Sequence, residues 1–207
     1  ELEGALRMTL AGPELTGQAR YLSVDPERLA YTTRMLDLEH RQVLDGTRGW
    51  ALSMMGDSAA LVASDSSALL ALHGILHSDV VHVLRSASAV MADPIAQDRG
   101  VLDGKPCDRV EFVAPYTGRT RLSLDPTSHR VIAVEELPTP QGMWRERRRW
   151  SDFVQVDGVW WPRQEVREVD GEKVTTANLH RIVVNGAVDS TLFRRPLVVR
   201  GQIRGVE

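Results

Sequence analysis

Five turn dipeptides divide the chain and limit its fold more than any other feature of the sequence. They are Asp45-Gly46, Asp103-Gly104, Asp157-Gly158, Asp170-Gly171 and Asn185-Gly186. Aspartate, asparagine and glycine tolerate a positive φ angle, so these pairs are preferred centres of type I′ hairpin turns. Because hairpins join neighbouring antiparallel strands, the dipeptides predict an antiparallel meander.

The segments between the turns alternate apolar and polar residues, which is the pattern of strands with one buried face. The first example runs from Leu2 to Leu10 and the last from Val174 to Val184. We expect about ten such strands. A sheet of this size must curl or close to cover its apolar face. The predicted fold class is therefore mainly β with some helix (α+β), a curled antiparallel sheet in a single domain over residues 1–207.

Residues 64–88 break the alternation and predict two short helices. The leucines that recur there at helical spacing are Leu69, Leu72 and Leu76. Ser64 or Asp65 is expected to cap the first helix, and Ser78 or Asp79 the second. On the concave side of a curled sheet, the two helices would form a lid.

Movement of such a lid would open an apolar cavity suited to a lipid-like ligand. The residues expected to line the cavity or the lid are Leu6, Met8, Leu10, Leu29, Tyr31, Met35, Trp50, Leu52, Leu69, Leu72, Leu76, Val80, Trp150 and Trp160. Trp160 and Trp161 are adjacent in one predicted strand, so at most one of them faces the interior.

Composition and missing motifs exclude several classes of function. The formal net charge of -3 and the pI near 6.1 argue against nucleic-acid binding, which usually needs a basic surface. No apolar run reaches the roughly 18–20 residues of a membrane span, so any membrane contact is expected to be peripheral. The sequence has no P-loop, G-x-S-x-G or G-x-G-x-x-G motif, and we predict no enzyme activity, cofactor or metal.

Two clusters leave an alternative open. His73 and His77 are spaced so that two imidazoles on a helix could bind one metal ion, but no third ligand or HExxH motif accompanies them. We therefore favour partly exposed lid histidines. Arg145, Arg147 and Arg149 alternate on one strand face, which we expect to be a solvated outer face, with a receptor for anionic groups as the alternative.

An enzyme on the same scaffold is a third hypothesis, because a fold does not dictate function. It would need a polar group of residues inside the sheet. The polar residues able to point inward are His40, Gln42, Asp152 and His180. Their scattering in space, or their exposure to solvent, would exclude this hypothesis.

The order of several segments resembles one known family over roughly residues 1–196. These segments are Asp25-Pro26-Glu27-Arg28-Leu29, Asp45-Gly46, Gly104–Val110, Leu122–Pro126, Trp150–Phe153, Val156–Pro162 and Asp189–Pro196. They are similar to segments of the LolA/LolB-type lipoprotein carriers and outer-membrane lipoprotein-sorting proteins. No lipid-contact residue of that family is matched one for one.

The resemblance implies an unclosed β-barrel with a helical lid, a periplasmic location, and a cavity for the acyl chains of a lipid or lipoprotein. An envelope protein is a further partner that it implies. LolA-like domains also occur within larger envelope proteins and regulators. The alternative function is accordingly a non-catalytic sensor or interaction domain.

Overall fold

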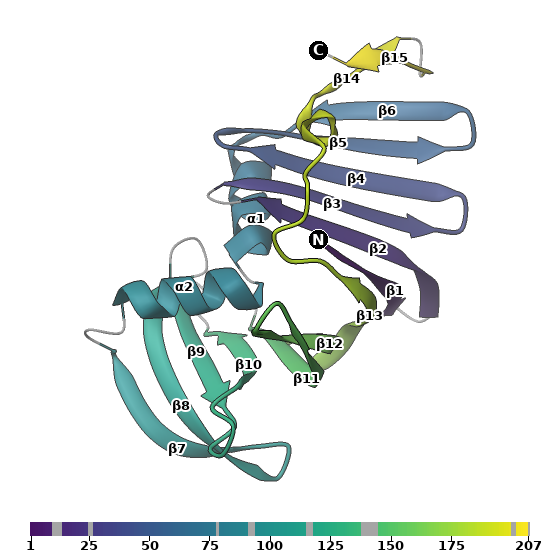
Figure 1. Cartoon of the computed structure of the whole chain (residues 1–207). Coiled ribbons are helices and arrows are strands. Elements are labelled where there is room, and N and C mark those ends of the chain that lie inside the picture. Colours follow the sequence, from purple (N-terminus) through teal and green to yellow (C-terminus); the bar gives the residue numbers. More distant parts are fainter. Residues whose placement is uncertain are drawn as a thin grey trace.

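One large antiparallel sheet dominates this computed structural model (Figure 1). The structure describes residues 1–9, 14–24, 27–77, 79–90, 94–114, 118–137, 145–199 and 202–206. Within these ranges the sheet has 13 strands, and a separate hairpin has two. The helices α1 and α2 lie on one side of the sheet.

The strands of the large sheet are β1 (Leu2–Thr9), β2 (Glu14–Val24), β3 (Arg28–Met35), β4 (Leu38–Asp45), β5 (Arg48–Met55), β6 (Ser58–Ala63), β7 (Ala96–Leu102), β8 (Lys105–Ala114), β9 (Gly118–Leu124), β10 (Val131–Glu136), β11 (Glu146–Val156), β12 (Val159–Val169) and β13 (Glu172–Ile182). The other elements are α1 (Ser66–His77), α2 (Val80–Val90), the 3-10 helix η1 (Ser190–Phe193), β14 (Pro196–Val199) and β15 (Gln202–Val206).

The strand order shows two meanders joined at the centre of the sheet. From one edge to the other it is β6-β5-β4-β3-β2-β1-β13-β12-β11-β10-β9-β8-β7. The joint is the antiparallel pair β1–β13, in which Leu6 lies opposite Ala177 and Met8 opposite Thr175. The outermost strands β6 and β7 do not pair with each other, so the sheet is curled but unclosed. The predicted fold class is confirmed.

Three of the predicted hairpin turns have positive φ angles at both central residues. In Asp103-Gly104, Asp157-Gly158 and Asp170-Gly171 the angles lie between 49° and 85°, as a type I′ turn requires. Asp45-Gly46 joins β4 to β5. Asn185-Gly186 differs from the prediction, because the chain leaves the sheet after β13 and no strand follows directly.

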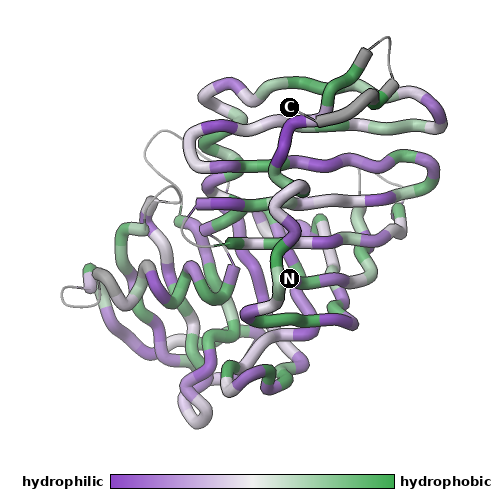
Figure 2. Tube along the Cα trace, turned by 45° about the horizontal axis from the view of Figure 1, so that its top comes forward, coloured by the Kyte–Doolittle hydropathy of each residue, from purple (hydrophilic) through white to green (hydrophobic). Residues whose placement is uncertain are grey.

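Three strands of the large sheet were not among the ten or so predicted, because their side chains show no clear alternation of apolar and polar residues. The inward positions of β2 include small Gly17 and Ala19. Strand β6 is mostly exposed, and β7 is exposed along most of its length. An edge strand that is exposed to solvent on both faces has no continuous row of apolar side chains. Figure 2 shows the alternation of apolar and polar residues along many of the other strands.

The two predicted helices are present, and both begin at a predicted capping residue. The Asp65 carboxylate accepts a hydrogen bond from the Ala68 amide at 2.8 Å. The Asp79 carboxylate accepts one from the His82 amide, also at 2.8 Å. Each bond satisfies an amide that the first helical turn leaves unpaired. The described helices include none long and apolar enough to cross a membrane.

Each helix covers a filled core on the concave face. Under α1, Leu72 and Leu76 pack against Leu29 and Leu44 of the sheet. Gly49 lies opposite Leu44 and allows this approach, because a Cβ atom there would sit 2.9 Å from the Leu69 side chain. Under α2, the core residues include Val80, Val83, Ala87, Phe112, Leu122 and Trp150.

A third core lies on the opposite, convex face of the N-terminal half of the sheet. Trp50 and Leu52 pack there against Phe193 of η1. Figure 1 shows the C-terminal segment, η1 followed by β14, crossing this face on the side away from α1. The Trp50 indole nitrogen lies 3.5 Å from the Phe193 carbonyl oxygen, to which it donates. The convex face is thus apolar here, and the C-terminal segment covers it.

The placement of Trp50 and Leu52 corrects the expectation that they line the concave cavity. In the β4–β5 pair, inward-facing Leu44 lies opposite Gly49, and outward-facing Val43 lies opposite Trp50. Alternation in the sequence identifies one apolar face of β5, but it does not identify which side of the sheet that face joins.

Candidate functional site

A cavity of about 530 Å³ lies on the concave face, between the two helix-covered cores. The central strands contribute its walls, and the junction between α1 and α2 contributes Ile75 and Asp79. Its lining is Leu2, Leu6, Met8, Ala19, Tyr21, Tyr31, Thr33, Met35, Leu38, His40, Gln42, Ile75, Asp79, Arg148, Glu165, Arg167, Thr175 and Ala177. We call it the central cavity.

One side of the central cavity is apolar because consecutive strands present their inward faces in register. Leu6 of β1 is buried, and Met8 is half-buried two positions further along the same face. Tyr21 and Tyr31 lie opposite each other on β2 and β3, and their rings meet edge to face at 6.5 Å. Such edge contacts fix aromatic side chains in place and leave their apolar surfaces toward the cavity.

The junction of the two helices is tied to the sheet at the Asp79 carboxylate. The Tyr21 hydroxyl donates to Asp79 Oδ2 at 2.7 Å, and His82 Nδ1 lies 2.8 Å from the same oxygen. Burial would raise the Asp79 pKa, but the hydrogen bonds and charge of His82 outweigh it and lower the pKa. Burial and the neighbouring Asp79 charge raise the Tyr21 pKa well above its usual value. Tyr21 therefore stays protonated and can keep donating.

Charged residues of β11 and β12 line the other side of the central cavity. The Glu146 carboxylate pairs with Arg148 at 2.8 Å and with Arg167 at 2.5 Å. Burial opposes the charge of Glu146, but both guanidinium groups outweigh that effect and lower its pKa to about 2. The Glu165 carboxylate accepts from the Trp150 indole at 2.9 Å. The lining also contains the acids Asp79 and Glu165, so two acids balance the two arginines of the cavity.

This combination suits a hydrocarbon ligand better than a chemical reaction. The apolar wall would gain from burying a chain, whereas Arg148 and Arg167 already have an acidic partner. The polar residues of the enzyme hypothesis do not meet. His40 and Gln42 line the cavity, but Asp152 and His180 are exposed elsewhere.

The structure brings together some of the residues predicted to bind a ligand. Leu6, Met8, Tyr31 and Met35 line the central cavity. The others lie elsewhere: Leu29, Leu72 and Leu76 in the core under α1, half-buried Leu69 against that core, Val80 and Trp150 in the core under α2, Trp50 and Leu52 on the convex face. Leu10 lies outside the described residues. A role in ligand binding stays a prediction for the residues that line the cavity.

At most one of the adjacent tryptophans faces the interior, as predicted, but it is Trp161, which corrects the expectation that Trp160 lines the cavity. The Trp160 side chain is 42% exposed, with the Arg130 guanidinium 3.6 Å above its ring, whereas Trp161 is 9% exposed and belongs to the core under α2. Trp161 shares the inward face of β12 with Glu165 and Arg167, because side chains alternate along the strand.

Several cavity residues were missed, although the sequence contained a signal for some of them. Asp79 was expected to cap a helix, and Arg148 lies between Arg147 and Arg149 on the other face of their predicted strand. Ile75 lies one position before Leu76 on α1 and gave no separate signal. Glu165 and Arg167 follow the Trp-Trp-Pro segment at alternate positions, and only the strand register joins them to Arg148.

The histidines of the helices do not form a recognisable metal site. The His73 and His77 rings stack with centroids 6.4 Å apart, and His77 meets His82 edge to face at 5.4 Å. In the part of the chain that the structure describes, no three histidine, cysteine or acidic side chains are grouped as metal ligands. Burial and the nearby His82 lower the His77 pKa, so this side chain is neutral near pH 7.

Comparison with known proteins finds similarity in structure alone. No protein-family model matches the chain, and no curated protein matches its sequence. A DUF1329 family protein from Desulfovibrio piger superposes with a TM-score of 0.60 at 11% identity, over 93% of this chain and 88% of that one. A LolA superfamily protein from Nitrosomonas europaea gives 0.58 at 12% identity, over 94% and 89%.

A third crystal structure, from Vibrio parahaemolyticus, is named as a domain of an outer membrane lipoprotein-sorting protein. It superposes with a TM-score of 0.55 at 9% identity, over 93% of this chain and 87% of that one. All three identities are low, so the likeness concerns the fold. The chain has a LolA-like fold, as the order of its segments predicted.

Proposed function

Starting from the LolA-like fold, we propose that this protein is a non-catalytic carrier that binds the acyl chains of a lipid or lipoprotein. The observation that carries the proposal is the central cavity, a space of about 530 Å³ with one apolar wall, between two filled cores. Pockets for small ligands commonly measure about 300–1,000 Å³ and combine apolar walls with a few polar groups. The central cavity has both properties.

Burial of methylene groups would supply the affinity. Each buried methylene contributes about 0.8 kcal/mol, so a chain with about ten of them inside would gain about 8 kcal/mol before the costs of association. Because Asp79 and Glu165 balance Arg148 and Arg167 in the lining, the cavity offers no net positive charge to a ligand. We therefore expect chain length, more than head-group charge, to govern binding.

The helix junction is the proposed entrance to the central cavity. Ile75 and Asp79 form part of the lining, and the Tyr21–Asp79 hydrogen bond ties them to β2. Opening would break that bond without unfolding the cores that hold α1 and α2. The two helices would then act as the lid that the sequence predicts.

A periplasmic location and contact with the envelope are part of the proposal. Support comes from the LolA-like fold and from the name of the Vibrio neighbour, which places that protein in outer membrane lipoprotein sorting. The organisation of residues 1–207 as a single domain likewise stays a prediction.

A fluorescent fatty acid tests the proposal. Met35 lines the central cavity and is half-buried, so Met35→Glu would place a charge against the bound chain. We expect at least a tenfold weaker affinity, measured by titration. Val101→Glu adds the same charge at an exposed position of β7 and should leave the affinity unchanged.

Native mass spectrometry after gentle purification gives an independent readout, because a co-purified lipid would add its mass to the protein. Extraction of that lipid would identify its class. Absence of fatty-acid binding in the folded wild-type protein would falsify the proposal, as would equal weakening by Met35→Glu and Val101→Glu.

A further inference from the structure

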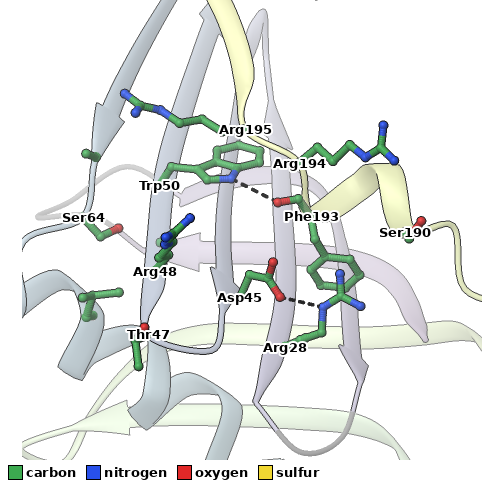
Figure 3. A pocket seen from close by; sticks show the side chains of 13 residues that line it. Arg28, Asp45, Thr47, Arg48, Trp50, Ser64, Ser190, Phe193, Arg194 and Arg195 are labelled. Atoms are coloured by element: carbon green, nitrogen blue, oxygen red, sulfur yellow. Dashed lines mark hydrogen bonds and ion pairs between the residues drawn. The ribbon is translucent and has the colours of Figure 1, made fainter. Parts of the chain in front are cut away.

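A second pocket, of about 780 Å³, lies at the ends of β3, β4 and β5, between the C-terminal segment and the start of α1 (Figure 3). We call it the arginine pocket, because Arg28, Arg48, Arg194 and Arg195 all line it. Arg28 and Arg48 belong to β3 and β5, and the other two follow η1. The pocket therefore forms only when the C-terminal segment lies on the sheet.

The arginine pocket is strongly positive, although the chain as a whole is acidic. Its lining contains four arginines and one acidic residue, Asp45, a formal charge of +3. The complete chain carries a formal net charge of -3. A local charge opposite to that of the whole molecule indicates a site for an anion.

One of the four arginines already has a structural role. The Arg28 side chain pairs with Asp45 at 2.8 Å and lies 4.0 Å above the Phe193 ring. It thereby joins the β4 end to η1 by a charge pair and a cation–π contact. Figure 3 shows the Arg28 guanidinium against the Phe193 ring, with Asp45 beside it. Asp45 is the only acid in the pocket lining, so no acid of the lining remains for the other arginines.

Arg48 and Arg195 remain available for a ligand. Arg48 lies opposite Asp45 in the strand register, but Asp45 forms its ion pair with Arg28. Both Arg48 and Arg195 are exposed, and neither forms an ion pair with any residue that the structure describes. In Figure 3 they lie on either side of Trp50. Arg194 is a third exposed arginine of the lining.

Other arginines of the sheet behave differently. Arg145 and Arg147 share the buried carboxylate of Glu135, at 2.6 and 3.0 Å. Arg149 pairs with Asp103 and Glu168. The outer face of β11 therefore neutralises its arginines with acids from neighbouring strands, and it does not favour the anion receptor considered from the sequence. The arginine pocket lacks such acids.

Apolar and hydroxyl groups complete the pocket. Trp50, Phe193 and Leu69 supply apolar surface, and Thr47, Ser64 and Ser190 supply hydroxyl groups. Guanidinium groups bind phosphate oxygens through paired hydrogen bonds, and hydroxyl groups can donate to the same oxygens. We propose that the arginine pocket binds a phosphate group, through Arg48 and Arg195, at a site separate from the central cavity.

Two sources could supply this phosphate group, a lipid head group or a soluble phosphorylated compound. Pyrophosphate represents the soluble source in isothermal titration calorimetry. Vesicles of phosphatidylcholine with and without phosphatidylglycerol represent the lipid source in a sedimentation assay. Binding to pyrophosphate would identify a soluble ligand, and binding only to phosphatidylglycerol vesicles would identify a head group.

The double variant Arg48→Gln/Arg195→Gln removes both available guanidinium groups. We expect roughly a hundredfold loss of affinity for the probe that the wild type binds, about tenfold for each arginine. Arg99→Gln/Arg163→Gln removes the same charge at exposed positions of β7 and β12 outside the pocket lining, and should retain most of the affinity. Thermal unfolding would check that both double variants fold.

Failure to bind either probe would overturn the proposal. Equal loss of binding in the two double variants would also overturn it, because it would show a general effect of charge. Both outcomes are independent of fatty-acid binding in the central cavity. Retention of that binding in Arg48→Gln/Arg195→Gln would show that the two sites are separate.

Discussion

The convex face of the sheet is covered in two different ways, by a chain segment around Trp50 and by ion pairs in the C-terminal half. In the N-terminal half, Trp50 and Leu52 form an apolar surface that the C-terminal segment covers through Phe193. In the C-terminal half, the buried carboxylates of Glu111 and Glu135 join arginines from neighbouring strands. The region around Trp50 thus depends on a covering segment, whereas the C-terminal half covers its convex face with ion pairs.

This difference determines what an arginine does. In the C-terminal half, arginine side chains lie across carboxylates and shield them from water. In the N-terminal half, the outward strand ends carry Arg28 and Arg48 with a single acid, Asp45, between them. Arginine alternation along a strand therefore predicts an anion site only when the facing strands lack acids.

The largest effect on this comparison should come from removing the cover of the N-terminal half. Phe193→Ala would leave Trp50 facing a void and would remove the ring beneath Arg28. We expect a loss of about 3–5 kcal/mol in the free energy of unfolding, as for other buried aromatic residues. Leu197→Ala in exposed β14 should cost less than about 1 kcal/mol in the same urea titration. Similar losses in both variants would contradict a specific cover.

The second-largest effect is expected from low pH, which should reduce the stability of the C-terminal half. The folded pKa of Glu146 is about 2, below its value in an unfolded chain, so the unfolded state binds the proton more readily. The contribution of Glu146 to the free energy of unfolding is therefore complete above about pH 4.5, and it is lost as the pH falls through about 2. The change is at most about 3 kcal/mol, and Glu146→Gln should reduce the pH dependence of unfolding between these limits. An unchanged pH profile would exclude this role.

A smaller effect is expected from one carboxylate of the outer face. Glu135 is 8% exposed in its side chain and contacts Arg121, Arg145 and Arg147. Because these arginines are partly exposed, solvent screens the pairs, and Glu135→Gln should cost about 1–2 kcal/mol. Exposed Glu172, which forms no ion pair with the described residues, provides the control Glu172→Gln, with a cost near zero. High salt should reduce the difference in stability loss between Glu135→Gln and Glu172→Gln, because it screens ion pairs.

The smallest effect should come from the hydrogen bond between the sheet and the helix junction. Tyr21→Phe removes the donor to Asp79 and should cost about 1 kcal/mol in stability. If the helices form a lid, the variant should also release a bound fluorescent fatty acid faster. Tyr31→Phe removes a hydroxyl that makes no hydrogen bond to the described residues, and should leave the stability unchanged. Equal release rates in Tyr21→Phe and the wild type would argue against a role of the Tyr21–Asp79 hydrogen bond in holding the lid closed.

The sequence predicted local structure well, because short-range chemistry determines it. Asp103-Gly104 and Asp157-Gly158 form hairpin turns because both residues accept a positive φ angle. Asp65 and Asp79 cap the two helices because their carboxylates reach the free amides of the first turn. These features need only neighbouring residues.

The side of the sheet that each strand face joins could not be predicted in the same way. Trp50 is outward and Trp161 inward because of pairings set by the whole meander. Alternation shows that a strand has two different faces, but it does not show which face points to the concave side of the sheet. For the same reason, Arg148 and Tyr21 gave no sign that they share a cavity, since 127 positions separate them in the chain.

The central β1–β13 pairing has a consequence for synthesis of the protein. Leu6 and Ala177 are opposite neighbours, but the ribosome adds them 171 positions apart. Until β13 emerges, β1 is an open edge whose backbone groups could pair with another nascent chain. Such long-range pairing is slow because the intervening chain must first be brought together. Aggregation during translation is therefore the hazard that this topology creates.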